Sequence, residues 1–182
     1  MKKHFLKGKK ADIWISTVLY TLISLAIIGT LLGVVRPRID EMRDHYLIDQ
    51  TIGALNQIDK TVTSVKTAQG MRLPVEFQLS RGILIFNTTS KIIQWSLPDS
   101  RYQYSETGFP VSIGKLSLKT SNTSSDRWNI LVQLNYSDII FTVNNQSIPK
   151  TYQSSSRVYS IWAENKGTDP ATSMLKIDFR LE

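Results

Sequence analysis

Residues 13–35 read IWISTVLYTLISLAIIGTLLGVV and contain no charged side chain. An apolar run of about 23 residues is long enough to cross a hydrocarbon core of about 30 Å as a helix. The hydroxyl side chains in the run are compatible with such a helix, because they can bond to carbonyl groups one turn earlier. These side chains are Ser16, Thr17, Thr21, Ser24 and Thr30.

Two other interpretations of this segment fit the sequence less well. The apolar part of a cleaved secretory signal is shorter and ends in a small-x-small cleavage site, whereas this run ends in Arg36-Pro37-Arg38. A buried core helix is disfavoured because the run is long and uncharged. The segment therefore predicts one membrane-spanning helix over residues 13–35.

The charge of the chain is concentrated at its beginning. The protein has 182 residues, a formal net charge of +7 and no cysteine. Five cations precede the first acid, Asp12; they are Lys2, Lys3, Lys7, Lys9 and Lys10. A basic flank on the N-terminal side of an apolar helix predicts a cytoplasmic N-terminus, with the rest of the chain outside the cell. Since the remaining basic residues are scattered among acids, no nucleic-acid partner is expected.

Gly29 and Gly33 form a Gly-x-x-x-Gly pair within the apolar run. In a membrane helix this spacing allows a second helix to approach closely. Small residues that are tolerated by chance would produce the same pattern, so both interpretations stay open at the level of the sequence.

Helical periodicity continues beyond the apolar run. Apolar residues recur at steps of mostly three and four and predict a narrow buried stripe: Ile39, Met42, Tyr46, Ile48, Ile52, Leu55, Ile58, Val62 and Val65. The polar residues between them predict a solvated face: Asp40, Glu41, Arg43, Asp44, Asp49, Gln50, Asn56, Gln57, Asp59 and Lys60. We expect Pro37 to kink this helix without ending it, and we expect the helix to end near Thr67, before Gly70.

Residues 71–182 read as short strands separated by turns. Residues 75–79 and 83–86 flank Arg81-Gly82 and predict a tight hairpin. Further strands are predicted at 91–97, 115–120, 128–134, 138–144, 157–163 and 174–181. Several such strands favour an antiparallel meander or sandwich that covers the amphipathic half of the helix. In the last strand, Leu175, Ile177, Phe179 and Leu181 alternate with Lys176, Asp178 and Arg180, which predicts burial of one face only.

The sequence offers no recognisable catalytic constellation. The absence of cysteine excludes thiolate metal sites, cysteine nucleophiles and disulfides. The two histidines, His4 and His45, are expected to be solvated, and no phosphate-binding loop, metal motif or nucleophile elbow occurs. Trp95, Trp128 and Trp162 fall in strand patterns and are expected to be core or sheet-face residues. We therefore expect no enzymatic activity, no metal and no cofactor.

Four Asn-x-Ser/Thr sequences lie in the predicted outer domain, at Asn87, Asn122, Asn135 and Asn145. Such sequences accept N-linked glycans on exported surfaces. Asn87 and Asn122 lie in turn-like segments and are the favoured acceptors. Asn135 and Asn145 are equally compatible with ordinary strand or turn residues.

The basic leader KKHFLKGKK, followed directly by ADIWISTVLYTLISLAIIGTLLGVV and then by a helix that continues into a β-domain, resembles archaeal type IV pilin-like proteins. The resemblance is specific over residues 7–35, architectural over 36–70 and generic beyond. It implies a class III signal peptide that a prepilin peptidase removes on the cytoplasmic side. It also implies apolar helices that bundle into a filament core, as in archaellins and pilins, with the outer domains on the filament surface.

The resemblance implies particular residues for processing and assembly. Cleavage after Gly8 leaves Lys9 as the new N-terminus, and cleavage after Ala11, before Asp12, also fits the pattern. Lys9 and Lys10 between Gly8 and the apolar run depart from the usual arrangement. In related pilins a carboxylate near the helix start meets the new amino terminus of a neighbouring subunit, and Asp12 occupies that place here. The alternative is that Asp12 is a helix N-cap serving the N–H groups of Trp14 or Ile15.

These observations predict an α+β chain of three parts, with a leader at 1–10, a long helix at 11–70 and an outer β-rich domain at 71–182. The expected function is that of a structural subunit, major or minor, of an extracellular type IV pilus-like filament. The expected partners are copies of the chain or other pilins, membrane lipid before assembly, a prepilin peptidase and the assembly machinery. The alternative is a single-pass anchored binding or sensing module that does not polymerise.

Overall fold

The structure of the chain is a computed structural model that describes residues 9–181, with side chains described for residues 14–180. It is α+β, with one long helix, α1, and a β-domain. α1 runs from Lys9 to Val65 and continues through Pro37 without ending. The chain divides between Asp40 and Glu41 into two units. The first contains the inner half of α1, and the second contains the outer half together with all the described strands.

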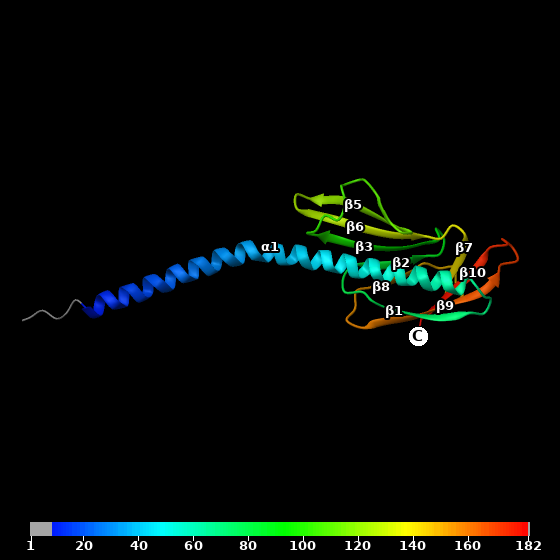
Figure 1. Cartoon of the computed structure of the whole chain (residues 1–182), viewed down its shortest axis with the longest axis horizontal. Coiled ribbons are helices and arrows are strands. Elements are labelled where there is room, and N and C mark those ends of the chain that lie inside the picture. The colour runs from blue at the N-terminus through cyan, green and yellow to red at the C-terminus, as the bar shows by residue number, and fades with distance from the viewer. Residues whose placement is uncertain (1–8, 182) are drawn as a thin grey trace, which may run out of the picture. The chain divides into compact units, whose positions relative to one another are not determined.

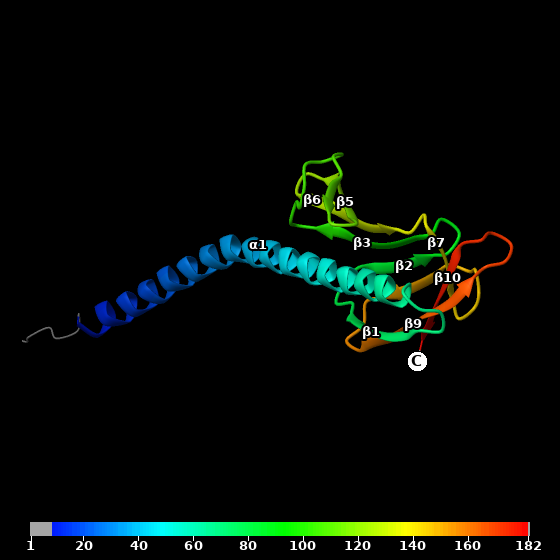
Figure 2. The ribbon, with the colours of Figure 1, turned by 45° about the vertical axis from the view of Figure 1, so that its right-hand side comes forward.

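The β-domain consists of two sheets. One has four strands in the order β1-β9-β10-β7, and the other has six in the order β4-β5-β6-β3-β2-β8. The strands are β1 Arg72–Gln78, β2 Ile83–Asn87, β3 Ile92–Ser100, β4 Val111–Ile113, β5 Leu116–Ser124, β6 Arg127–Asn135, β7 Ile139–Val143, β8 Lys150–Gln153, β9 Val158–Thr168 and β10 Leu175–Leu181. Figures 1 and 2 show the outer half of α1 lying along β3 of one sheet and β1 of the other.

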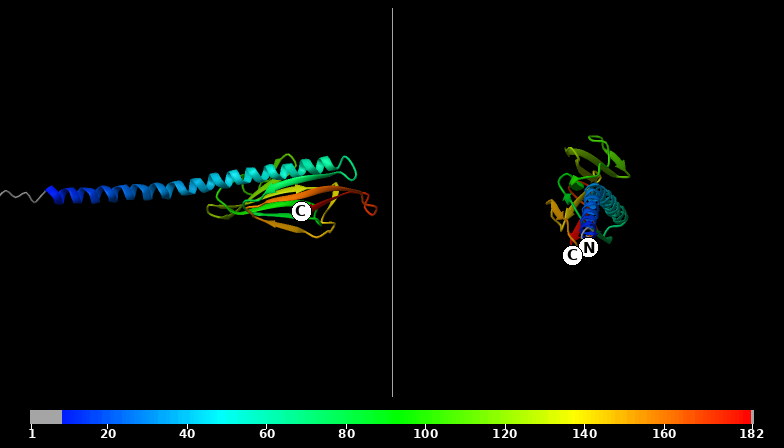
Figure 3. Two further views of the ribbon diagram at one scale, coloured as in Figure 1. Left: turned by 90° about the horizontal axis from the view of Figure 1, so that it is seen from below. Right: turned by 90° about the vertical axis from the view of Figure 1, so that its left-hand side faces the viewer.

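The outer half of α1 forms a central part of the domain core. Seven of its apolar side chains are buried, at steps of one, three or four residues: Leu47, Ile48, Ile52, Leu55, Ile58, Val62 and Val65. Burial of one such side chain stabilises the folded state by about 1.5–3 kcal/mol. Seven of them contribute on the order of 10–20 kcal/mol as an upper bound. Figure 3 shows this half of α1 lying along the strands. It is therefore an integral part of the folded β-domain.

The predicted apolar stripe is confirmed from Ile48 to Val65 and is wrong at its start. Ile39, Met42 and Tyr46 are exposed, and Leu47 is buried instead. Asp44 was expected on the solvated face, yet it is 3% exposed because its carboxylate pairs with Arg81. Asp59, also assigned to that face, is half-buried because it accepts a hydrogen bond from Tyr136. The corrections at Asp44 and Asp59 each reflect a partner that is distant in the sequence.

The predicted tight hairpin around Arg81-Gly82 is wrong. β1 pairs with β9, and β2 pairs with β3 and β8, so the chain passes from one sheet to the other at this point. Leu79 is buried at the crossing, and Gly82 has a φ of +84°. A Cβ atom on Gly82 would lie 2.5 Å from the Ser96 carbonyl oxygen and from Trp95 Nε1, so a glycine is required here.

The other predicted strands are confirmed, and two short ones were missed. β4 and β8 have three and four residues, which is too short for an alternating pattern to stand out. The sheets are mostly antiparallel, but β7 and β10 pair in parallel. The expected one-sided burial of the last strand fails at Asp178, which is 0% exposed. Its Oδ1 accepts hydrogen bonds from Thr142 Oγ1 and from the Asn145 N–H, both at 2.7 Å. These bonds offset the cost of burying the carboxylate.

Two substitutions on α1 test the corrected helix face. Ile58→Ala should lower the free energy of unfolding by about 2–5 kcal/mol, because a fully buried side chain leaves a cavity. Met42→Ala should change it by less than about 0.5 kcal/mol, because Met42 is 72% exposed. Urea unfolding of the full chain in detergent, followed by tryptophan fluorescence, measures both. A large loss for Met42→Ala, or none for Ile58→Ala, would contradict the assigned face.

Candidate functional site

The inner half of α1 presents apolar side chains in every direction. Each side chain from Trp14 to Val35 is exposed. Fourteen of them are large and apolar: Trp14, Ile15, Val18, Leu19, Tyr20, Leu22, Ile23, Leu25, Ile27, Ile28, Leu31, Leu32, Val34 and Val35. A helix that is apolar all round is suited to a nonpolar environment and not to water.

The helix is long and apolar enough to cross a membrane. Its most apolar window has a mean hydropathy of 2.4, and none of that window is buried within the structure. A core helix of a soluble domain would be buried, so this segment is not one. At 1.5 Å per residue, residues 14–35 span about 33 Å, close to the thickness of a hydrocarbon core.

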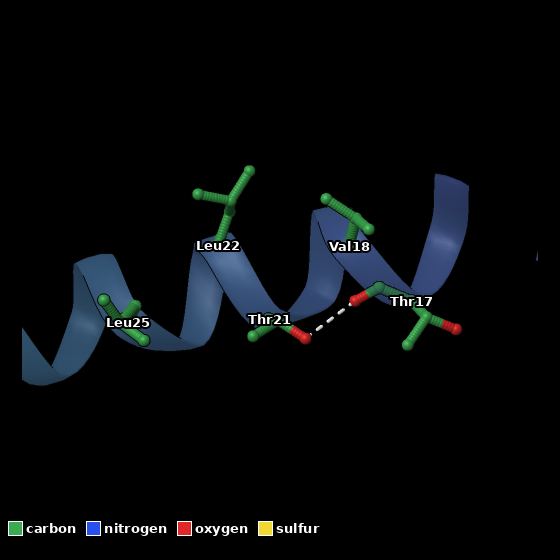
Figure 4. Close-up of a pocket in the computed structure, with 5 residues that line it drawn as sticks. All are labelled: Thr17, Val18, Thr21, Leu22 and Leu25. Atoms are coloured by element: carbon green, nitrogen blue, oxygen red, sulfur yellow. Dashed lines mark hydrogen bonds between the residues drawn. The ribbon is translucent and has the colours of Figure 1, made fainter. Parts of the chain in front are cut away.

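The threonines of the apolar half satisfy their own hydroxyl groups. The Thr21 hydroxyl donates to the Thr17 carbonyl and the Thr30 hydroxyl donates to the Ala26 carbonyl, each at 2.8 Å. Figure 4 shows the first of these bonds. The back-bonding expected from the sequence is thus confirmed for Thr21 and Thr30, and it reduces the cost of placing these two side chains in a medium without water.

One face of the inner half is lined by small residues. Ala26, Gly29, Thr30 and Gly33 follow one another at steps of three, one and three, so they lie on one side of the helix. A Cβ atom added at Gly29 or Gly33 would meet nothing within 4 Å inside the structure. The structure therefore has space for a Cβ atom at both glycines. The sequence indicated the two glycines but not Ala26 and Thr30, which the same spacing could have revealed.

Shallow grooves run between the side chains of this segment. One is lined by Thr17, Val18, Thr21, Leu22 and Leu25 (Figure 4). A second, lined by Trp14, Ile15, Val18, Leu19 and Leu22, lies one turn away. Both are open to the surroundings and almost wholly apolar. Grooves of this kind accept the side chains of a neighbouring helix or the tails of lipids.

The predicted processing residues lie at the edge of the described region. Gly8 is outside the described residues, whereas Lys9 and Ala11 belong to the first turn of α1. Asp12 also lies inside α1, three residues after its first residue, so the N-cap interpretation of Asp12 is wrong. The role of its carboxylate in assembly stays a prediction, since the described side chains begin at residue 14.

Polar contacts fasten the outer half of α1 to the β-domain near both of its ends. The buried Asp44 carboxylate pairs with Arg81 and accepts a hydrogen bond from the Arg101 N–H at 2.8 Å. At the other end, the Asn165 side chain donates to the Val65 carbonyl at 2.8 Å. This carbonyl is one of those left without a partner at a helix C-terminus, so a buried asparagine of β9 caps the helix.

Two further contacts hold the last turns of α1. The Tyr136 hydroxyl donates to Asp59 at 3.1 Å, and burial followed by the charge of Asp59 raises the pKa of Tyr136 far above its usual value. The Tyr136 hydroxyl therefore stays protonated at physiological pH and remains a donor. Lys66 Nζ lies 2.6 Å from Asp138, and this hydrogen bond lowers the pKa of that carboxyl. These ties fix the position of the outer half of α1 on the sheets.

The four predicted glycosylation sites differ in their surroundings. Asn122, Asn135 and Asn145 are exposed. Asn87 is half-buried, and its Oδ1 accepts a hydrogen bond from the Ser90 N–H at 3.0 Å in the turn between β2 and β3. Asn145 lies in the loop between β7 and β8 at a φ of 60°, with its N–H bonded to Asp178.

His45 is partly exposed and has more contacts than the sequence indicated. Its ring stacks on Tyr102 with 4.3 Å between centroids, and its Nε2 lies 3.2 Å from Asp49. Trp95 is fully buried, while Trp162 is half-buried under the guanidinium of Arg72, 4.4 Å from the ring centre. Among the residues described, no group of three or more His, Asp or Glu side chains could hold a metal ion.

Comparisons with known proteins give no further assignment: the chain matches no protein-family profile, no curated protein sequence and no solved structure.

The absence of cysteine allows a direct test of the topology of the chain. Ser125→Cys places a single thiol in the exposed turn between β5 and β6, and Ser24→Cys places one in the apolar half of α1. On intact cells, a membrane-impermeant maleimide should label Ser125→Cys and should label Ser24→Cys only after detergent is added. Labelling of Ser24→Cys on intact cells, or protection of Ser125→Cys, would contradict the membrane assignment.

Proposed function

We propose that the protein is a structural subunit of an extracellular type IV pilus-like filament, with residues 14–35 of α1 in the membrane before assembly and among other subunits afterwards. The observation that carries the proposal is the exposure of fourteen large apolar side chains on a helix that continues directly into a folded domain. The resemblance of residues 7–35 to archaeal pilin-like proteins supports the same function.

The energetics require an environment other than water. Burial of a large apolar side chain stabilises by about 1.5–3 kcal/mol, so fourteen of them represent on the order of 20–40 kcal/mol. A folded domain is stable by only about 5–15 kcal/mol. Chains released into water would therefore associate through this segment, and lipid or helices of other subunits are its natural surroundings.

Exchange of lipid for neighbouring helices depends on close packing. Lipid tails are as apolar as leucine, so the hydrophobic effect alone does not drive helices together in a membrane. Van der Waals contact over small residues does, and Ala26, Gly29, Thr30 and Gly33 provide such a face. The open grooves of the inner half provide space for the side chains of the partner helix.

The outer half of α1 places a folded domain on every assembled helix. Asp44, Tyr136 and Asn165 hold this half against the sheets, so the domain is carried by the same element that packs in the filament core. Ile39, Met42 and Tyr46 follow at steps of three and four and stay exposed.

Substitution of the small face tests assembly. Gly29→Leu and Gly33→Leu should each reduce the yield of sheared filaments about tenfold, which corresponds to a loss of about 1.4 kcal/mol per subunit. Leucine raises helix propensity and its Cβ atom meets nothing within 4 Å, so insertion into the membrane should persist. Ser24→Leu, on the other side of the same helix, is the matched control and should assemble normally. Normal filaments from both glycine variants would contradict this interface.

Processing tests the function independently of packing. The intact mass of the chain purified from cells should show the loss of residues 1–8 if cleavage follows Gly8, or of residues 1–11 if it follows Ala11. Replacement of Gly8 by a bulky residue should abolish the first of these losses. An unprocessed chain that forms no filaments would favour an anchored module that does not polymerise.

A further inference from the structure

Part of the outer surface of the six-stranded sheet is free of charge: all of β2, β3 as far as Ser96, and β6 from Asn129 onward. There the side chains that point away from the core are amides, hydroxyls and aliphatic groups, since alternate residues of a strand face opposite sides. They are Ile83, Ile85, Asn87, Ile92, Gln94, Ser96, Asn129, Leu131, Gln133 and Asn135. We call these ten residues the uncharged face. Charges border this area: Lys119 of β5 pairs with Leu131 in the strand register, and Arg127 of β6 forms an ion pair with Asp99. The Gln133 side-chain amide donates to Gln94 Oε1 at 3.3 Å across the middle of the face.

The four-stranded sheet has an outer surface of a different kind. Its outward residues include Arg72, Glu164, Lys166 and Arg180, which form ion pairs or stack on Trp162. The four-stranded sheet thus carries charges across its outer surface, whereas the six-stranded sheet carries them only around the uncharged face. An exposed aliphatic and amide surface on a sheet favours association with other chains unless something covers it.

The strand register brings two of the four glycosylation sequences together on this face. Asn87 pairs with Ile92 across β2 and β3, and Ile92 pairs with Asn135 across β3 and β6. Asn87 and Asn135 therefore flank Ile92 in one row, two strands apart, or about 10 Å. They are separated by 48 positions in the sequence, so only the fold reveals the pairing.

Both sequences are presented in the same way. In each, the middle residue is buried, Thr88 in one and Tyr136 in the other, while the hydroxyl residue two positions after the asparagine, Thr89 or Ser137, is exposed. The buried middle residue anchors the segment to the core. The asparagine and the hydroxyl residue that the modification requires are left on the accessible side.

We propose that N-linked glycans on Asn87 and Asn135 stand side by side and cover the uncharged face. Asn122, at the far end of β5, and Asn145, in the loop between β7 and β8, lie away from this row. The hydroxyl groups of sugars can form hydrogen bonds with the amides of the uncharged face, and no charged side chain within this face requires an ionic partner. The inference rests on the proposed function only in placing the domain outside the cell.

The modification requires a sugar that is activated as a phosphate ester at its anomeric carbon. Asparagine Nδ2 forms the bond to that carbon, and the bond from the carbon to the phosphate oxygen breaks. The phosphate leaves with the bonding electron pair, and one amide proton passes to a base. The activated donor belongs to the class of lipid-linked saccharides, and no oxidant or reductant takes part.

Peptide mass spectrometry of the full chain from its own cells tests the two sites. Trypsin should release residues 82–91 with Asn87, residues 120–127 with Asn122, and residues 128–150 with both Asn135 and Asn145. We expect the first and third peptides to carry saccharide mass. T89A should remove it from residues 82–91, and S137A should remove the part that belongs to Asn135. T89S and S137T keep the required hydroxyl and are the matched controls.

These variants leave both asparagines in place, including the hydrogen bond from the Ser90 N–H to Asn87, so a folding defect is not expected. Recovery of Asn87 and Asn135 mainly unmodified in the parent chain would overturn the proposal. Normal N-terminal processing and filament assembly in the same cells would show that the proposed function stands without it.

A second measurement tests the covering of the face. The double variant T89A/S137A should bundle or aggregate more than T89S/S137T, by at least several-fold in light scattering of sheared filaments or of detergent-solubilised protein. Equal scattering from the two double variants would show that the glycans do not shield the face and would overturn that part of the proposal.

Discussion

A helix with fourteen exposed, large apolar side chains is the constraint on which the rest of this protein depends. Water would oppose that arrangement by more free energy than a domain of this size has available. The inner half of α1 is therefore suited to lipid or to packing among other apolar helices. The arrangement of the charges and the satisfied hydroxyls of Thr21 and Thr30 are consistent with that surrounding.

From residue 41 onward, the same helix is part of a folded domain, in which its apolar side chains are buried on one face. There, one face supplies seven buried side chains to a core built by two sheets, and the buried groups of Asp44, Tyr136 and Asn165 tie it in place. Because a single element carries both halves, any association of the inner halves brings the β-domains along. The proposed filament uses the inner half of α1, and the proposed glycan cover uses the uncharged face of the β-domain.

Much of this architecture was predictable from local patterns, and the failures have two causes: partners that are distant in the sequence and the limited precision of a periodic pattern. The uncharged run at 13–35 and the periodicity from Ile48 to Val65 identify both halves of the helix, and alternation identifies most strands. The burial of Asp44 depends on Arg81, which lies 37 positions later. Arg81-Gly82 forms a crossing between sheets instead of a hairpin, because β1 pairs with β9 and not with β2. The exposure of Met42 and Tyr46 arises because a periodic pattern locates a helix face only to within about one residue. Asn87 and Asn135 were visible as separate sequences, but their pairing required the register of three strands.

The behaviour of a chain that begins at Arg36 tests the central claim most directly. It lacks the apolar half of α1 and retains every buried residue of the domain core. Analytical ultracentrifugation without detergent should show a soluble monomer, and urea should unfold it cooperatively, whereas the full chain should require detergent to stay dispersed. A shortened chain that aggregates or has no cooperative transition, or a full chain that is monomeric in water, would contradict the assignment of residues 14–35 to lipid and to other subunits.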